Sequence, residues 1–163
     1  MPLTEFHGNA HIDIAAPADA VFAVLLDVER LPDWNTHVHH VIEHPGRPLT
    51  EGAEWVIEMR DMGTPWPSRA KATVVDATAR RFEHTSHSDD GNPSYALWSW
   101  QVSPAADGCT LTVTWTGYPR SFWRRNLLAR IRAPRLAREV QASLAGLPAY
   151  LTRTGPVAGF GRG

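Results

Sequence analysis

IDIAAPADAVFAVLLDVERLPDWN, residues 12–35, is the stretch that decides the fold class of this chain. It begins as a strand, because the apolar residues Ile12 and Ile14 alternate with polar ones and so share one face. Pro17 follows, a residue favoured at the first position of a helix. Apolar residues then recur at the spacing of a helix with one buried face: Val21, Val24, Leu25, Val28 and Leu31. Pro32 interrupts this helix, and LPDWN predicts one further short turn of helix.

From residue 38 to 117 the pattern changes to strands separated by turn signals. The turn signals are the stretches HPGRP, MGTPWP, SDDGNP and PAADG. We predict strands over residues 38–44, 53–61, 68–77, 80–88, 94–103 and 109–117. Alternation places three sets of residues on common faces: Trp55, Ile57 and Met59; Trp98, Trp100 and Val102; Leu111, Val113 and Trp115. The short connections favour an antiparallel meander.

The last segment returns to helical periodicity. One apolar stripe runs through Leu136, Val140, Leu144, Leu147 and Leu151, which predicts a long amphipathic helix. Pro134 cannot donate the backbone bond that a helix interior requires, so we expect residues 120–133 to form a separate or kinked helical piece. Residues 155–163 are predicted to form a flexible tail.

These elements predict an α+β helix-grip architecture. A strand, two short helices, six more strands and a long C-terminal helix bury the apolar face of the sheet if the sheet curls around the last helix. We therefore expect a seven-stranded curved antiparallel sheet around that helix, as a single domain over residues 1–154. The length of 163 residues and the hydrophobic fraction of 43% suit one globular domain with a full-sized core.

Two stretches carry a resemblance to a known family. IDIAAPADAVFAVLLDVERLPDWN resembles the strand, Ala-Pro, helix and Trp opening of the START-like superfamily, also called SRPBCC or Bet v 1-like. WSWQVSPAADGCTLTV, residues 98–113, is similar to the strand, Pro, Gly-Thr, strand hairpin of its polyketide cyclase/dehydrase group. The resemblance covers roughly residues 8–152 and implies a hydrophobic cavity between the sheet and the long helix. Cys109 departs from the usual threonine of the hairpin, and Pro134 departs from the usually continuous last helix.

The predicted inner face of the sheet is rich in aromatic side chains. Tryptophan offers a flat apolar surface with one hydrogen-bond donor, which suits a planar or polycyclic ligand. The expected ligand-binding residues are Trp34, Trp55, Ile57, Met59, Phe82, Trp98, Trp100 and Trp115. The alternative is that these rings only fill the core.

His84 is the candidate catalytic residue. If Phe82 points inward, a period of two places His84 and Ser86 inward as well. A histidine in the cavity can remove a proton next to a carbonyl or assist the loss of water, which are steps of aldol cyclisation and aromatisation. The alternative is a buried histidine that is satisfied by a neighbouring group.

The segment WNTHVHHVIEH, residues 34–44, contains four histidines. On a regular strand His37 and His39 would point together, with His40 and His44 on the opposite face. The spacing His37-x-His39-x3-Glu43 resembles half of a cupin metal motif, but the rest of that motif is absent. We therefore interpret the segment as an edge strand whose polar side chains protect unpaired backbone, and expect no metal.

Seven arginines lie between Arg120 and Arg138, interleaved with apolar residues. Such a basic amphipathic segment could face an anionic membrane or an acidic carrier protein, and Arg124 or Arg125 could meet an anionic group of the ligand. A solvated helical face is the common alternative. Nucleic acid is not expected, because the remaining surface is not basic.

The composition points to no cofactor and no oxidising compartment. Cys109 is the single cysteine, and MPLTEFHGNAHID lacks an apolar signal core, so we expect a cytoplasmic protein. The leading hypothesis is a protein that binds a hydrophobic, aromatic or polyketide-like molecule and catalyses its cyclisation or dehydration. The alternative is a non-catalytic carrier or sensor of a lipid or metabolite. Oligomeric state is left open.

Overall fold

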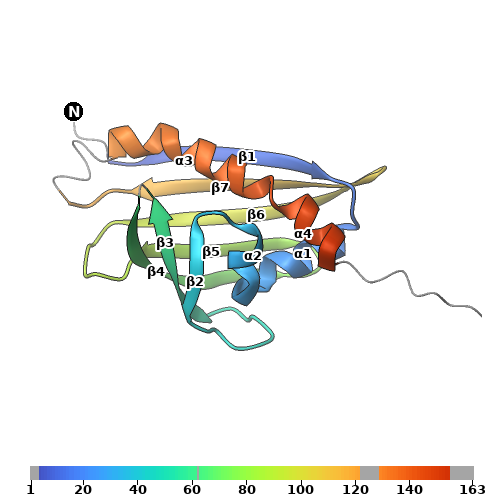
Figure 1. Ribbon diagram of the computed structural model, residues 1–163, viewed down its shortest axis with the longest axis horizontal. Helices are drawn as coiled ribbons and strands as arrows, with labels where there is room; N and C mark the ends of the chain where they lie inside the picture. Colours follow the sequence, from blue (N-terminus) through green and yellow to red (C-terminus); the bar gives the residue numbers. More distant parts are fainter. Residues whose placement is uncertain (1–3, 62, 122–128, 155–163) are drawn as a thin grey trace, which may run out of the picture.

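Seven strands hydrogen-bond into one antiparallel sheet, in the order β1-β7-β6-β5-β4-β3-β2 (Figure 1). The computed structural model describes residues 4–61, 63–121 and 129–154. Strands β2 to β7 form the predicted meander, and β1 pairs with β7 at the far edge of the sheet. The strands are β1 (Phe6–Ile14), β2 (Val38–Glu43), β3 (Glu54–Asp61), β4 (Thr64–Asp76), β5 (Arg81–Ser88), β6 (Tyr95–Ala105) and β7 (Gly108–Tyr118). The predicted α+β helix-grip fold is confirmed.

The strand register brings the predicted inner face together. On the β5–β6 ladder Phe82 is paired with Trp100, and His84 is paired with Trp98. Trp98 is in turn paired with Trp115 on β7. Because directly paired residues share a face of the sheet, the aromatic residues predicted from alternation form one continuous inner surface.

Strand β4 begins four residues earlier than predicted, at Thr64 instead of residue 68. Pro65 and Pro67 lie within it, paired with Arg60 and Glu58 of β3. The carbonyl oxygen of Pro67 accepts a bond of 2.9 Å from the backbone of Asp89, so the proline nitrogens face the side away from β3. A strand tolerates proline at positions where the backbone nitrogen need not donate a hydrogen bond to a neighbouring strand. The turn predicted at MGTPWP was therefore too long, because residues 64–67 belong to β4.

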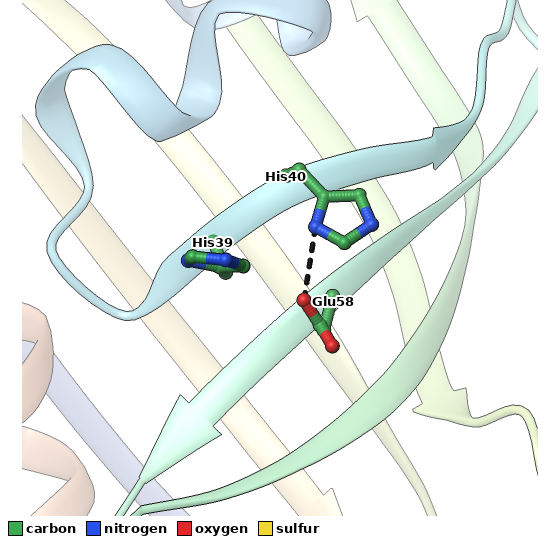
Figure 2. A group of neighbouring side chains, drawn as sticks. All are labelled: His39, His40 and Glu58. Carbon is green, nitrogen blue, oxygen red and sulfur yellow. Dashed lines mark ion pairs between the residues drawn. The ribbon is translucent and has the colours of Figure 1, made fainter.

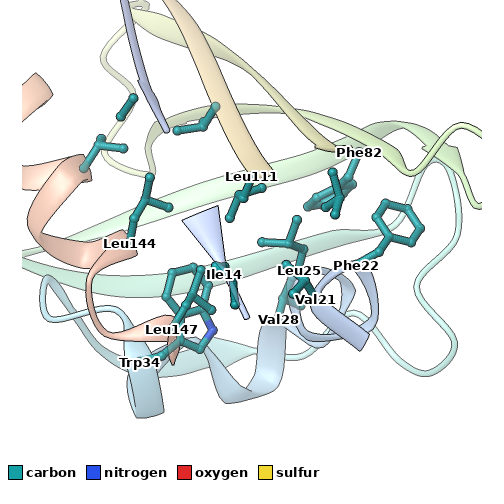
Figure 3. Packing of buried hydrophobic residues seen from close by; sticks show 14 of the residues in the cluster. Ile14, Val21, Phe22, Leu25, Val28, Trp34, Phe82, Leu111, Leu144 and Leu147 are labelled. Carbon is teal, nitrogen blue, oxygen red and sulfur yellow. The ribbon is translucent and has the colours of Figure 1, made fainter. Parts of the chain in front are cut away.

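Three short helical segments close one end of the sheet: α1 (Ala18–Leu26), the 3-10 helix η1 (Val28–Arg30) and α2 (Leu31–Trp34). Val21, Phe22 and Leu25 of α1 are buried. Figure 3 shows them with Phe82 and Leu111 of the sheet and with Leu144 and Leu147 of the C-terminal helices. This cluster is the main hydrophobic core.

The C-terminal region contains two helices, α3 (Ala129–Leu144) and α4 (Leu147–Thr154). The helix continues through Pro134, so the predicted interruption there is wrong for residues 129–133. A proline removes one helical hydrogen bond, and packing of α3 along β1 outweighs that loss. The chain breaks at Gly146 instead, where a side-chain Cβ would lie 2.3 Å from the carbonyl oxygen of Trp34.

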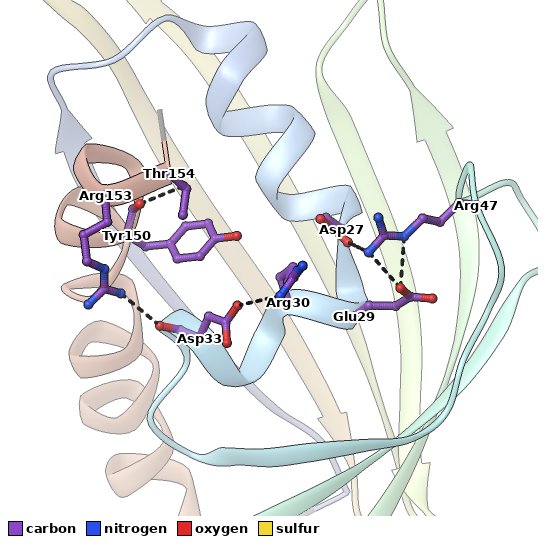
Figure 4. A network of polar contacts seen from close by, with 8 residues as sticks. All are labelled: Asp27, Glu29, Arg30, Asp33, Arg47, Tyr150, Arg153 and Thr154. Carbon is purple, nitrogen blue, oxygen red and sulfur yellow. Dashed lines mark hydrogen bonds and ion pairs between the residues drawn. The ribbon is translucent and has the colours of Figure 1, made fainter. Parts of the chain in front are cut away.

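Polar contacts brace the closed end (Figure 4). Arg47 forms ion pairs with Asp27 at 3.1 Å and with Glu29 at 2.7 Å, which tie the connection after β2 to η1. Arg153 of α4 donates a hydrogen bond of 3.4 Å to the carbonyl oxygen of Asp33 in α2. Each exposed ion pair contributes about 0–1 kcal/mol, so their main effect is to orient the helices.

None of the helices within the described ranges is long and apolar enough to cross a bilayer. The predicted tail, residues 155–163, lies outside the described residues.

Candidate functional site

A cavity of about 680 Å³ lies between the inner face of the sheet and α3. Leu25, Val28 and Leu144 line it where the core closes one end of the sheet. Eight residues that the sequence predicted for the site line it as well: Trp34, Trp55, Ile57, Met59, Phe82, His84, Trp98 and Trp100. The predicted hydrophobic cavity is therefore present, and aromatic side chains form a large part of its wall.

His84, Trp98 and Trp100 form a nearly flat section of this wall. The His84 ring is inclined by 12° to Trp98 and by 18° to Trp100, with ring centroids 6.1 and 6.4 Å apart. The indole Nε1–H of Trp100 donates to Nε2 of His84 at 3.0 Å. Because such a bond runs close to both ring planes, the two rings lie edge to edge and present their faces to the cavity.

The polar atoms of His84 are both engaged. Its Nε2 accepts from Trp100, so the ring proton of the neutral form is on Nδ1, which lies 3.3 Å from the carbonyl oxygen of Thr85. Burial lowers the pKa of His84 to about 4, against the smaller opposing effect of the bond to Thr85. The imidazole is therefore neutral at pH 7.

The indole N–H of Trp98 also has a hydrogen-bond partner on β5. Its Nε1–H donates to the hydroxyl oxygen of Ser86 at 2.8 Å. Ser86 also lines the cavity, and its hydroxyl hydrogen remains available to a ligand. With both indole donors directed at β5, a ligand would meet the flat faces of these rings together with the Ser86 hydroxyl.

Of the two remaining predicted ligand-binding residues, one is placed differently and the other is not described. Trp115 does not line the cavity: it is 3% exposed and packs against Trp98 with ring centroids 5.5 Å apart. Its indole lies over Gly8 of β1, where a Cβ would be only 2.2 Å from the ring, so the missing side chain leaves the space that Trp115 fills. Arg124 lies outside the described residues.

The other end of the cavity is more polar. It is lined by residues from the end of β5, the β5–β6 connection and the first turns of α3: Ser88, Asp90, Ser94, Arg132 and Arg135. Glu139 of α3 also lines the cavity, with its carboxylate 3.5 Å from Arg132. The guanidinium of Arg132 lies 5.2 Å from the ring centre of Trp66, a cation–π contact. The cavity therefore has an apolar end at the core and a more polar end at the first turns of α3.

Sequence reasoning missed Glu139 and Arg132 as site residues. Both follow the same steps of three and four as the predicted stripe through Leu136 and Val140. The signal that could have identified them was a pair of charged residues on the apolar face of the last helix. Such a pair indicates that this face is not fully packed against the sheet.

The histidines of residues 34–44 also differ from expectation. His37 lines the cavity, whereas His39 and His40 are both exposed. The prediction that His37 and His39 point together is wrong, because a register shift between Val38 and His40 interrupts alternation.

Cys109 is not a candidate nucleophile. It is 2% exposed, and burial raises the pKa of its thiol. A buried cysteine in the thiol form is unreactive, so the chemistry available to the cavity is enclosure, ring stacking and proton transfer.

Solved structures with the same fold come from several kinds of protein. The Zhui aromatase/cyclase from Streptomyces sp. R1128 is 19% identical, with a TM-score of 0.73 over 95% of this chain and 98% of that one. A protein from Chromobacterium violaceum is 21% identical, with a TM-score of 0.70 over 88% and 95%. Ara h 8.0201 is 12% identical, with a TM-score of 0.70 over 91% and 99%.

No curated protein matches the sequence. The sequence does match, over residues 5–152, the family described as polyketide cyclase/dehydrase and lipid transport. This match spans nearly all of the described fold, including every strand and the wall of the cavity. The chain therefore belongs to the polyketide cyclase/dehydrase and lipid transport family.

Proposed function

We propose that this protein binds a hydrophobic, aromatic or polyketide-like small molecule in its cavity. The observation that carries the proposal is the flat section of wall formed by His84, Trp98 and Trp100, whose ring planes lie within 20° of one another. A volume of about 680 Å³ falls in the range of small-molecule sites, roughly 300–1,000 Å³. Planar rings with satisfied polar edges favour stacking with a planar apolar guest.

The catalytic form of the proposal is cyclisation or dehydration of the bound molecule. In this form Nε2 of His84 takes a proton from a carbon next to a carbonyl, and the resulting imidazolium returns it to a departing hydroxyl, which leaves as water. The enclosing cavity supplies the other contribution, because it holds a flexible chain in a reactive conformation. The step requires the Trp100 N–H to move away from Nε2. The family description and the aromatase/cyclase among the solved structures support this form.

The second candidate is a carrier or sensor that releases its ligand unchanged. The engaged nitrogens of His84 favour it, since a base whose lone pair is held by Trp100 and whose pKa is about 4 accepts few protons at pH 7. Lipid transport in the family description supports it as well.

Native mass spectrometry of the purified chain separates the two candidates. A bound molecule is identified, incubated with the protein and analysed for conversion. Catalysis predicts conversion that falls at least about tenfold in His84→Ala, a loss within the usual range for a general acid–base residue. His87→Ala, which removes another histidine of the cavity wall, is the matched control. Release of the molecule unchanged would support the carrier, and conversion that persists in His84→Ala would show that His84 is not the catalytic residue.

We also propose that the basic segment Arg120–Arg138 faces an acidic surface, of a carrier protein or an anionic membrane. Arg130 and Arg138 are exposed on α3, close to the polar end of the cavity. Binding to anionic vesicles and to an acidic carrier protein, each measured at low and high salt, distinguishes these partners.

A further inference from the structure

The free edge of the sheet, strand β2, contains a bulge at its histidines. Val38 is paired with Met59 and His40 with Glu58, so β2 advances by two residues where β3 advances by one. His39 is the extra residue. A bulge places consecutive side chains on the same side of a strand, and His39 and His40 are accordingly both exposed with ring centroids 5.4 Å apart.

Glu58 of β3 completes the group (Figure 2). Its Oε2 lies 2.9 Å from Nδ1 of His40. This approach lacks the geometry of a hydrogen bond, and Oε2 is shielded from solvent with no hydrogen-bond donor. The Glu58 side chain is only 19% exposed, so its carboxylate is held in place while one oxygen is left without a donor.

We propose that His39, His40 and Glu58 form a binding site for Zn²⁺. One ligand atom from each residue lies within 4.8 Å of those from the other two. Zn²⁺ accepts imidazole nitrogen and carboxylate oxygen at about 2.0–2.2 Å, which requires ligand atoms about 3.4 Å apart. Both histidines are exposed and can rotate to that spacing without displacing core residues.

The ion would take the shielded oxygen of Glu58 as a ligand and a water molecule as its fourth. It would join β2 to β3 on the outer side of the sheet, whereas the cavity lies on the inner side. The site is therefore independent of the proposed ligand binding.

Calorimetric titration of the metal-free, untagged chain with ZnCl₂ tests the proposal. We expect one equivalent to bind, and His39→Ala, His40→Ala and Glu58→Gln each to weaken binding by about tenfold or more, as loss of a ligand does in a three-ligand site. His44→Ala is the matched control, since His44 lies 3.5 Å from Glu29 in a histidine–carboxylate pair that lacks a second imidazole. Its affinity should equal that of the unmodified chain.

Thermal unfolding supplies a second readout. Zn²⁺ should raise the Tm of the unmodified chain and of His44→Ala, and should leave that of His40→Ala unchanged. Binding without a defined stoichiometry, or equal weakening in His44→Ala and His40→Ala, would show that the ion binds to scattered surface histidines and would overturn the proposal.

Discussion

The indole N–H of Trp100, on β6, donates a hydrogen bond of 3.0 Å to Nε2 of His84, on the neighbouring strand β5. The bond fixes the tautomer of His84, aligns the two rings and occupies the lone pair through which the imidazole would accept a proton. Trp100 therefore helps to shape the cavity wall, and its hydrogen bond opposes protonation of His84 in addition to the burial that lowers the pKa of His84.

Trp100→Phe is expected to raise the pKa of His84. The bond from Trp100 stabilises the neutral imidazole, so its loss favours protonation. NMR titration of the histidine ring protons gives the pKa directly. Trp98→Phe is the control, because the Trp98 indole donates to Ser86 instead. An equal shift in both variants would mean that general loosening of the wall, and not this bond, affects the pKa.

Stability should fall in mild acid because of His84. Its pKa is lowered from 6.5 to about 4 in the folded chain. Between these values the unfolded chain binds a proton that the folded chain does not, so the free energy of unfolding decreases as the pH drops from 7 toward 4. The contribution of this one group at pH 5 is about 2 kcal/mol at most.

Urea unfolding at pH 7 and pH 5 measures this effect. The unmodified chain should lose more stability over this interval than His84→Gln, whose amide oxygen can still accept the Trp100 bond. The other histidines are common to both proteins and cancel in the comparison. Equal losses would show that His84 is not held neutral by its surroundings.

Filling the cavity should block binding of aromatic molecules. Ala96 and Leu97 are neighbours on β6, but Ala96 lines the cavity whereas Leu97 is 41% exposed on the outer face. Ala96→Phe should weaken the binding of a fluorophore such as anilinonaphthalene sulfonate by about tenfold or more, because the added ring occupies space in the cavity. A tenfold loss of affinity corresponds to about 1.4 kcal/mol of binding free energy. Leu97→Phe places the same phenyl side chain on the outer face and should leave the affinity unchanged. Equal fluorescence titrations for both variants would place the dye elsewhere.

Alternation of apolar residues along β3, β5 and β6 was sufficient to predict a central part of the cavity wall. On β5 the period of two placed His84 and Ser86 on the face of Phe82, and all three line the cavity. Such predictions succeed because the side-chain direction on a regular strand depends only on local geometry.

The features that sequence did not reveal depend on contacts between distant segments. The bulge at His39 depends on how β2 is aligned with Glu58 and Met59 of β3. The position of Trp115 depends on the glycine across the ladder at Gly8. In both cases the deciding partner is not adjacent in sequence, so periodicity within one strand cannot indicate it.

The junction of α3 and α4 is a further case, and it gives the last prediction. Gly146→Ala would place a methyl carbon 2.3 Å from the carbonyl oxygen of Trp34, a backbone atom that cannot move without displacing α2. We expect a loss of about 2 kcal/mol in the free energy of unfolding, as for other overpacked positions.

Gly91→Ala is the control for this change. Its φ is 82°, but an added methyl group would meet no atom within 4 Å, so only backbone strain of about 1 kcal/mol is expected. Because Trp34 lines the cavity, Gly146→Ala should also weaken binding of the fluorophore, whereas Gly91→Ala should not. A smaller loss of stability in Gly146→Ala than in Gly91→Ala would mean that α4 can shift away from α2, and the closed end of the cavity would then be movable.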